Sequence, residues 1–509
     1  MQPIDLVAPG FLGVNLEQAN SLLSPRYARR ADNAVIDDEG RLANRNGYLP
    51  DTTTEITSTP SVKTIHEFRQ ADGTVEMIVA WDGGIGNDLA DPEGNDISGA
   101  VTDSDGRWWM QDFNDKCIGF QDGQKPIVYT GTGNFATVVE SAGTAPTIHN
   151  GVGACVYGRV WGLDSDGHTI KYSVLLDETD WASAGSGSID MHNVWIDGTD
   201  EVTAIWGFNG RLVVFGKRHI VIWEDGTGSQ LGLNPANIIV KDVVAGTGCL
   251  SQWTIQAVGK ADLLYLSSNG VQSLGRIIQE KSNPITTLSK YVRSDLLGRL
   301  NSADVDQIRS AYSPEEGFYI LSFPDEGISY CLDQRRRYID DDRELVSIAT
   351  TWDLAPTAWE RRDSGALLLG GAGEVSTYTG DDDDGSTFRF IYESPWLDLG
   401  ENVANRLKLL KRIGSILFVE TNTNIVFKWQ VDFNPVFDSI TKTVAGDATA
   451  EWGVGEWNLD EWSGGLTLRI LRIPARATGQ YYSLAVEAQV NGGFAIQQLE
   501  LFTKIGRIA

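Results

Sequence analysis

RLVVFGKRHIVIW, residues 211–223, joins two runs of β-branched and aromatic residues through a short polar turn that contains glycine. This pattern is typical of a β-hairpin, because β-branched and aromatic side chains favour strands and glycine accommodates a tight turn. The same pattern occurs at residues 262–274 (DLLYLSSNGVQSL) and 318–332 (FYILSFPDEGISYCL). The sequence therefore predicts a series of hairpins.

Glycines mark these hairpins at a nearly regular interval between residues 60 and 380. Successive turns lie 44 to 57 residues apart, and a four-stranded propeller blade occupies about 40–50 residues. The period therefore predicts an all-β fold built around a β-propeller with some loop insertions. The seven turn glycines are Gly73, Gly123, Gly167, Gly216, Gly270, Gly327 and Gly373.

The composition agrees with an all-β protein of two or three domains. The 509 residues exceed one ordinary core, and 41% of them are hydrophobic, including 16 Trp and 17 Phe. The 55 glycines exceed the average share of roughly 7%. Many of them occur in DG, NG or GG pairs, which favour turns because glycine adopts positive φ without steric cost.

The hairpin period divides the chain into three segments. Residues 1–60 form an N-terminal arm, residues 61–385 the propeller, and residues 386–509 a β-domain without the fifty-residue period. The last boundary follows four adjacent aspartates, whose mutual repulsion predicts an exposed loop. We expect the N- and C-terminal segments together to form a sandwich-like platform.

One helix is expected inside the propeller. Apolar residues recur every four positions near residues 286–300, which is the spacing of one helical face. This spacing predicts a helical insertion between two blades. The apolar positions are Leu288, Val292, Leu296 and Leu300.

The charge balance argues against a nucleic-acid-binding protein. The chain has 41 basic and 69 acidic residues, a net charge of −28, whereas nucleic-acid affinity rests on basic side chains that neutralise phosphates. The N-terminus lacks the basic start and apolar stretch of a signal peptide, and no run approaches the ~20 apolar residues of a membrane span. We expect a soluble protein made in the cytosol.

The cysteines show no metal or redox motif. They are far apart and form no CxxC pair, which argues against a zinc ribbon or a thioredoxin-type site. We interpret them as buried small apolar side chains in a reducing compartment. They are Cys117, Cys155, Cys249 and Cys331.

Catalytic and metal-binding signatures are also absent or incomplete. Two D-x-D-G segments, Asp103–Gly106 and Asp164–Gly167, resemble parts of a calcium loop but lack the full ligand set, so turns explain them. Ser104-Asp105-Gly106 followed by Trp108 only imitates the Asp-box of a sialidase propeller. No GxSxG, HExxH or Walker A pattern occurs, and the histidines lack metal-ligand spacing. The sequence predicts no enzyme and no catalytic, cofactor-binding or metal-binding residue; the histidines are His66, His149, His168, His192 and His219.

Two further clusters invite interpretation. Trp452, Trp457 and Trp462 recur every five residues, a pattern that suits packing or a subunit contact better than a glycan site or another role. Residues 335–337 are three arginines, and residues 340–342 are three aspartates. Local salt bridging between these two runs is expected rather than nucleic-acid binding.

Several stretches resemble one virion protein family when taken in order. They include ADNAVIDDEGRLANRNGY (31–48), GRVWGLDSDGHTIKYSVLLDETDW (158–181), WGFNGRLVVFGKRHIVIW (206–223) followed by GCLSQWTIQAVGKADLLYLSSNGVQSL (248–274), SPWLDLGENVANRLKLLKRIG (394–414) and FAIQQLELFTKIGRIA (494–509). On these stretches the chain resembles the tail nozzle proteins of short-tailed bacteriophages, also called tail tubular protein B or the distal tail accessory factor. The likeness spreads over nearly the whole length, but no single stretch is an invariant signature.

The resemblance implies a structural virion protein. In that family six copies form a ring below the adaptor that sits on the portal, and the ring encloses a channel that retains packaged DNA and opens for its ejection. The resemblance also favours six blades. It implies four partners: other copies of the chain, the adaptor, tail fibre or tail needle proteins, and passing double-stranded DNA that is not specifically bound. It places the protein in the virion tail, after synthesis in the bacterial host cytoplasm.

Three expectations follow from this reading. An acidic lumen would let DNA slide, the platform would face the adaptor, and deletion of residues 1–50 would leave the propeller folded but block attachment to the head. Two alternatives remain open: a receptor-binding tail protein, and a secreted propeller lectin or hydrolase.

Overall fold

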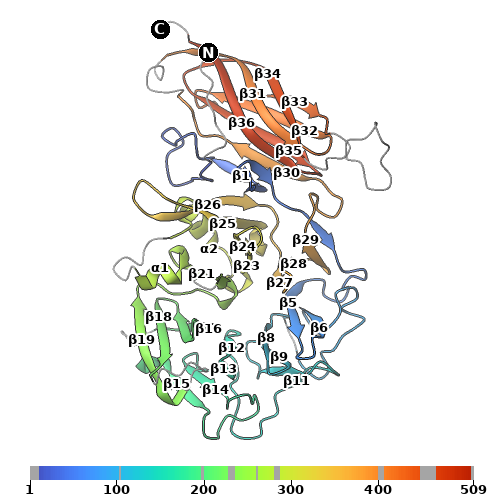
Figure 1. The fold of residues 1–509 in the computed structure, drawn as a ribbon, viewed down its shortest axis with the longest axis vertical. Coiled ribbons are helices and arrows are strands. Elements are labelled where there is room, and N and C mark those ends of the chain that lie inside the picture. Colours follow the sequence, from blue (N-terminus) through green and yellow to red (C-terminus); the bar gives the residue numbers. More distant parts are fainter. Residues whose placement is uncertain are drawn as a thin grey trace.

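The structure is a computed structural model that describes residues 11–102, 105–195, 200–226, 235–259, 262–279, 287–398, 406–446 and 466–505. The fold is all-β, as the hairpin pattern predicts. Figure 1 shows a ring of small sheets, with longer strands packed at one side of the ring. None of the helices in the described part of the chain is long and apolar enough to cross a membrane.

Seven antiparallel sheets follow one another around the ring (Figure 1). The first three are β5 (Val62–Arg69), β6 (Val75–Trp81), β7 (Gly84–Gly86); β8 (Trp109–Phe113), β9 (Lys116–Phe120), β10 (Ile127–Tyr129), β11 (Ala136–Thr137); and β12 (Gly153–Val156), β13 (Arg159–Leu163), β14 (Thr169–Tyr172), β15 (Gly187–Asp190). The next two are β16 (Val202–Phe208), β17 (Arg211–Gly216), β18 (His219–Asp225), β19 (Ile238–Ala245); and β20 (Gln256–Val258), β21 (Asp262–Ser267), β22 (Gly270–Ser273). The last two are β23 (Arg309–Ser313), β24 (Phe318–Phe323), β25 (Ile328–Ile339), β26 (Leu345–Trp352); and β27 (Ala358–Arg361), β28 (Leu367–Gly370), β29 (Val375–Tyr378), β4 (Tyr48–Pro50).

The first strands of these sheets form a closed ring. Strand β5 contacts β8, β8 contacts β12, β12 contacts β16, β20 contacts β23, β23 contacts β27, and β27 returns to β5. Strand β16 reaches the fifth sheet through the short helix η3 (Gln252–Thr254), which directly precedes β20. This arrangement is that of propeller blades around an axis, and we call the seven sheets blades one to seven in chain order.

The expectation of six blades is wrong. Each of the seven marked glycines lies in or directly beside a turn of a different blade: Gly73 lies between β5 and β6, Gly216 is the last residue of β17, Gly270 is the first residue of β22, and the other four lie between the second and third strands of their blades. Blade seven is completed by β4, which comes from the N-terminal arm and pairs antiparallel with β29 through Tyr48 and Tyr378. All seven marked glycines are therefore accounted for by blades within the described residues.

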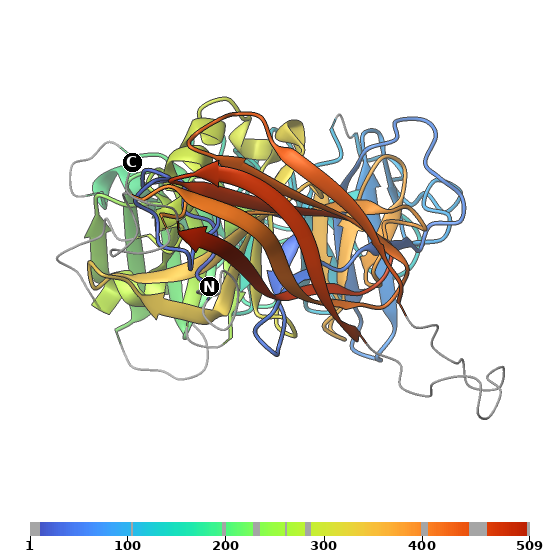
Figure 2. The same cartoon turned by 90° about the horizontal axis from the view of Figure 1, so that it is seen from above.

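Two longer sheets pack face to face as a β-sandwich (Figure 2). Buried residues alternate along β32, as expected for a strand with one face toward a core. Phe427 of β32 and Leu417 of β31 belong to the same buried cluster, so the two sheets share one core. The strands are β1 (Arg30–Asp32), β30 (Phe388–Glu393), β35 (Tyr482–Val490), β32 (Thr423–Val431), β33 (Asp438–Val444) in one sheet, and β2 (Ala34–Ile36), β3 (Leu42–Asn44), β36 (Phe494–Ile505), β31 (Lys408–Val419), β34 (Thr467–Gly479) in the other.

The propeller and the sandwich are joined by hydrogen-bonded strands. Strand β26 of blade six pairs in parallel with β1, and β1 pairs antiparallel with β30, so one nine-stranded sheet runs from the propeller into the sandwich. Tyr330 of blade six, Phe390 of the sandwich and Leu296 of a helix lie in one buried cluster. The two parts therefore share a core as well as a sheet.

The N-terminal arm is divided between both parts. Strands β1, β2 and β3 belong to the sandwich, whereas β4 is the outer strand of blade seven. A deletion of residues 1–50 would remove β4, so the expectation that it leaves the propeller intact no longer holds.

Helical segments lie mostly between blades five and six. Helix α2 (Arg293–Leu300) continues η4 (Lys290–Val292) within the range where the sequence predicts a helix, and it buries Leu296 completely. The remaining helical segments are α1 (Leu274–Gln279), η1 (Met191–Asn193), η2 (Pro235–Asn237), η5 (Val305–Gln307) and η6 (Pro324–Glu326).

Candidate functional site

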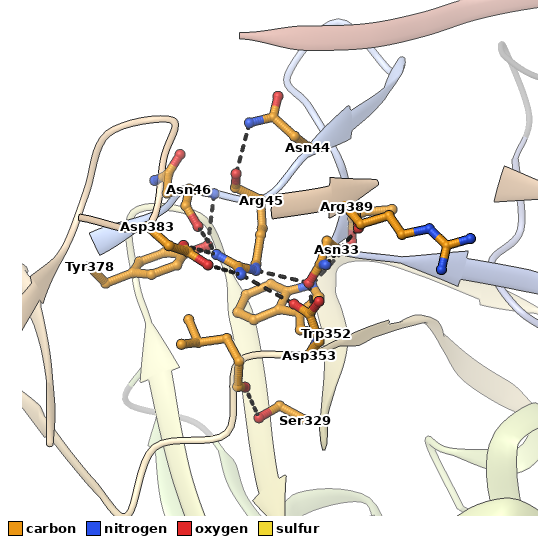
Figure 3. Close-up of polar contacts among 12 residues, drawn as sticks. Asn33, Asn44, Arg45, Asn46, Ser329, Trp352, Asp353, Tyr378, Asp383 and Arg389 are labelled. Atoms are coloured by element: carbon orange, nitrogen blue, oxygen red, sulfur yellow. Dashed lines mark hydrogen bonds and ion pairs between the residues drawn. The ribbon is translucent and has the colours of Figure 1, made fainter. Parts of the chain in front are cut away.

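Two places in the described structure gather polar side chains from distant parts of the sequence. The first, the junction network, lies where the propeller meets the sandwich and is centred on Arg45 (Figure 3). The second is a cavity on the propeller axis. Sequence reasoning singled out neither place.

Arg45 is the centre of the junction network, and its side chain is 1% exposed. Its Nη1 and Nη2 each lie 2.8 Å from an oxygen of Asp383, which makes a bidentate ion pair. Its Nε donates to Asn33 Oδ1 at 3.0 Å, and Nη2 also reaches Asp353 Oδ1 at 3.3 Å. The guanidinium stacks 4.2 Å from the ring centre of Phe388. One side chain thus binds residues of the opening segment, of the loop after β26 and of the loop before β30.

Electrostatics in the network favour the charged guanidinium. Burial alone would lower the pKa of Arg45, but the hydrogen bonds and charge of Asp383 outweigh burial, and the pKa lies above its usual value. Asn33 connects the network further: its Nδ2 donates to the carbonyl of Arg389 at 2.7 Å, and its Oδ1 accepts from the backbone N–H of Asp353 at 3.0 Å.

A close backbone approach fixes the neighbouring turn. A Cβ built on Gly47 would lie 1.6 Å from the carbonyl oxygen of Asp382, so only glycine fits there. The Gly47 N–H donates to the carbonyl of Gly380 at 2.8 Å, and Tyr48 N–H donates to Asp382 at 3.0 Å. The Asn-Arg-Asn-Gly-Tyr segment therefore docks against the four-aspartate loop, which is held in place rather than freely exposed.

The axial cavity has a volume of about 320 Å³. Residues from six of the seven blades line it, including Lys63, His66, Trp109, Trp206, Arg309 and Glu360. Trp109 lies 5.8 Å from Trp206 and 5.1 Å from Trp253, measured between ring centres. These indoles narrow the space along the propeller axis. The cavity therefore has the size of a small-molecule pocket, roughly 300–1,000 Å³.

Arg309 is the most unusual group of the cavity wall. The residue is 3% exposed, and its guanidinium stacks 4.3 Å from the ring centre of Trp253. Nη1 donates to two backbone carbonyls, whereas Nε and Nη2 have no hydrogen-bond partner among the described residues. Burial, assisted by nearby Arg107, lowers the pKa of Arg309 to about 9. Burial also lowers the pKa of Lys63, assisted by Arg309.

His66 also lines the cavity, but its neighbours are acidic side chains. Its Nε2 is 2.9 Å from Asp112 Oδ1, and its Nδ1 is 3.7 Å from Glu360 Oε1. Burial would lower the pKa of His66, but the hydrogen bonds to Asp112, Cys117 and Glu360 hold it well above the usual value. Sequence spacing could not reveal this group, because its members come from blades one, two and seven.

The expected salt bridges between residues 335–337 and 340–342 are not formed among the described ion pairs. Arg335 pairs with Asp38, and Arg337 lies 3.8 Å from Asp262. Asp340 and Asp342 both pair with Lys290 instead. The arginines extend along β25, whereas the acids form the turn that follows, which faces the η4 segment.

The remaining residues considered in the sequence analysis have structural roles wherever they lie within the described residues. Asp164 and Asp166 cap the β13–β14 turn: Asp164 pairs with Lys171, and Asp166 accepts from the backbone N–H groups of His168 and Thr169. All four cysteines are free; Cys155 is partly exposed and the rest are buried. Asp103, Ser104 and the three tryptophans at 452, 457 and 462 lie outside the described residues.

Comparisons with known proteins give no family. No family model and no curated protein matches the chain. Among solved structures, similar chains include the computationally designed protein Ika8 (14% identity, TM-score 0.36, 65% of this chain and 99% of that one). The extracellular domain of a hybrid two-component system protein of B. thetaiotaomicron is 13% identical, with a TM-score of 0.41 over 87% of this chain and 61% of that one. PorZ, of the type-IX secretion system of Porphyromonas gingivalis, is 13% identical, with a TM-score of 0.35 over 70% of this chain and 43% of that one.

Proposed function

We propose that this chain is the structural subunit of a homohexameric tail nozzle of a short-tailed phage, and that it is not an enzyme. In this role it attaches below the portal adaptor, retains packaged DNA and provides the channel for genome ejection. The main support for the proposal is that the two terminal stretches that resemble the family lie together in the folded chain. Residues 31–48 and 494–505 meet in one sheet, where β3 pairs with β36, and Arg45 ties that region to the propeller.

The size of the axial cavity constrains where DNA passes. A cavity of about 320 Å³ with several indoles on its wall, among them those of Trp109, Trp206 and Trp253, cannot admit a duplex. The channel must therefore lie between subunits of a ring and not along the axis of each propeller. A ring contact of the head-to-tail kind closes when its rotation suits the number of copies.

The net charge suits a channel that does not hold DNA. Six copies would carry 6 × (−28) = −168 charges, and DNA carries one negative charge per roughly 1.7 Å of its axis. Repulsion at physiological salt fades over about 8 Å, so the acids that line the lumen decide the effect. We infer that this lumen is acidic and lets DNA slide, and that the sandwich faces the adaptor as a platform.

Cryo-electron microscopy of the tail vertex of intact virions tests the proposal. The expected result is six copies around an axial channel beyond the adaptor, with the sandwich toward the head and carboxylates on the channel wall. Trimers at the periphery would instead favour a receptor-binding tail protein. Density without this chain would remove it from the virion, and a basic channel wall would refute the sliding argument.

A further inference from the structure

Three side chains of the types that bind transition metals meet beside the axial cavity, and one of them, His66, lines its wall. His66, Asp112 and Cys117 each present a ligand atom, and these atoms all lie within 4.8 Å of one another. Cys117 is completely buried, and His66 is largely buried. They come from β5, β8 and β9, so the fold and not a local motif assembles them.

The β8–β9 hairpin fixes two of the three groups. Asp112 and Cys117 are directly opposite each other in its register, so their side chains project from the same face at short range. The turn residues Asn114 and Asp115 have φ values of 46° and 65°, as a two-residue turn with positive φ at both positions requires. This turn holds the register that pairs the carboxylate with the thiol.

The imidazole of His66 is oriented by acids on both of its nitrogens. Its Nε2 faces Asp112 at 2.9 Å, and its Nδ1 lies 3.7 Å from Glu360 of blade seven. Histidines that bind metals commonly have a carboxylate at the nitrogen that does not bind, which fixes the tautomer and orients the ring. Glu360 occupies that position here, with Nε2 directed toward Asp112.

We propose that His66, Asp112 and Cys117 bind a zinc ion at the wall of the axial cavity, with Glu360 as the carboxylate behind the histidine. Zinc accepts thiolate, imidazole and carboxylate ligands together, whereas calcium and magnesium prefer oxygen ligands alone. Small movements of these side chains place all three atoms at about 2.0–2.3 Å from one ion. Binding as a thiolate releases the thiol proton of Cys117 to solvent. The fourth position is left for water or for a ligand in the cavity.

The position of this site gives it a structural effect. Its ligands connect blades one and two, and Glu360 of blade seven contacts the ligand His66, so the ion joins blades one and two next to blade seven. A ligand that binds the folded chain and not the unfolded chain stabilises it by mass action. Zinc should therefore raise the midpoint of unfolding of the full-length protein.

Cobalt substitution of the full-length protein tests the site. The protein is purified with a chelator, dialysed and titrated with Co²⁺ alone and then with Zn²⁺ alone. We expect one tightly bound equivalent, the charge-transfer absorption of a thiolate–cobalt bond, proton release on binding, and loss of the absorption when zinc displaces cobalt.

Variants assign the ligands. Cys117→Ser should abolish the thiolate absorption, and Glu360→Gln should weaken zinc binding by about 10- to 100-fold. Cys331→Ser is the matched control, because Cys331 is also a buried free thiol but lies in blade six. His192→Ala is the second control, because His168, Asp190 and His192 form another group of metal-ligand type on blade three.

The outcomes separate the possibilities even if Cys117→Ser fails to fold. Wild-type protein that binds neither cobalt nor zinc in the titration, or binds cobalt without a thiolate absorption, overturns the proposal. Binding that survives Cys117→Ser but disappears with His192→Ala also overturns it. A thiolate absorption that persists in Cys331→Ser and His192→Ala, with one equivalent bound, supports it.

Discussion

Replacing Arg45 with methionine removes the centre of the junction network while keeping most of the volume of its aliphatic stem. The change deletes the two hydrogen bonds to Asp383 and the one to Asn33, and it leaves the Asp383 carboxylate facing an apolar group. Asn33 still accepts from the backbone of Asp353, so the main loss falls on Asp383.

The expected cost follows from the burial of the pair. Removing one partner of a buried ion pair costs about 3–5 kcal/mol, because the other charge stays uncompensated. Asp383 is 18% exposed and so keeps some contact with water. The expected loss of unfolding free energy is therefore near the lower end of this range, about 3 kcal/mol. The double variant Arg45→Met/Asp383→Asn removes that stranded charge and should recover about 1–2 kcal/mol of it.

Urea unfolding at pH 7, followed by circular dichroism, measures these differences. Arg29→Met is the matched control, because Arg29 pairs with Glu393 at the same junction but is 44% exposed, and an exposed pair contributes at most about 1 kcal/mol. If Arg45→Met destabilises the protein no more than Arg29→Met does, the junction network does not join the two parts as described. A double variant less stable than Arg45→Met alone would refute the stranded-charge argument.

Two further predictions concern backbone space and pH. Gly47→Ala should lower the thermal unfolding midpoint, because the new Cβ would collide with the Asp382 backbone, whereas Gly298→Ala in α2, with open space around it, should stabilise the protein by roughly 0.5–1 kcal/mol; equal midpoints in calorimetry would contradict this. Burial raises the pKa of Glu316 to about 7 from its usual 4.5, so its contribution to stability is greatest below pH 4.5 and is lost as the pH rises to 7. Glu316→Gln should therefore become more stable than the wild type across that window, by up to about 3 kcal/mol at pH 8, and parallel stability curves against pH would refute the assignment.

The sequence predicted the all-β fold because its hairpin signals are local. A run of β-branched residues, a turn glycine and a second run all lie within about 15 residues, and each of the seven marked glycines is found in a blade turn or at the strand end next to it. The expectation of six blades came from the family resemblance and was wrong; the seven hairpin turns each mark a blade, and blade seven takes its last strand from the other end of the chain, which no local pattern indicates. Strand β4 has three residues, and its partner β29 begins more than 300 residues later.

The candidate sites could not be predicted because their members meet only in the folded ring. Arg45 and Asp383 are 338 positions apart, and His66 lies 46 positions before Asp112. One local signal was present for the junction. An arginine between two asparagines, followed by Gly-Tyr, is unusual at the end of a short strand, and each of those asparagines and the arginine forms hydrogen bonds in the structure.

The nine-stranded sheet that crosses from propeller to sandwich has a mechanical consequence. A pull on the sandwich reaches blade six through the pairing of β1 with β26, through the adjacent Asn33 N–H, which donates to the carbonyl of Thr351 at 2.7 Å, and through the ion pair of Arg45 with Asp383. Neither half can swivel against the other unless these bonds break. Force applied at one end of the chain is therefore transmitted as displacement of the whole body, and in the proposed ring any opening motion would have to occur between neighbouring copies.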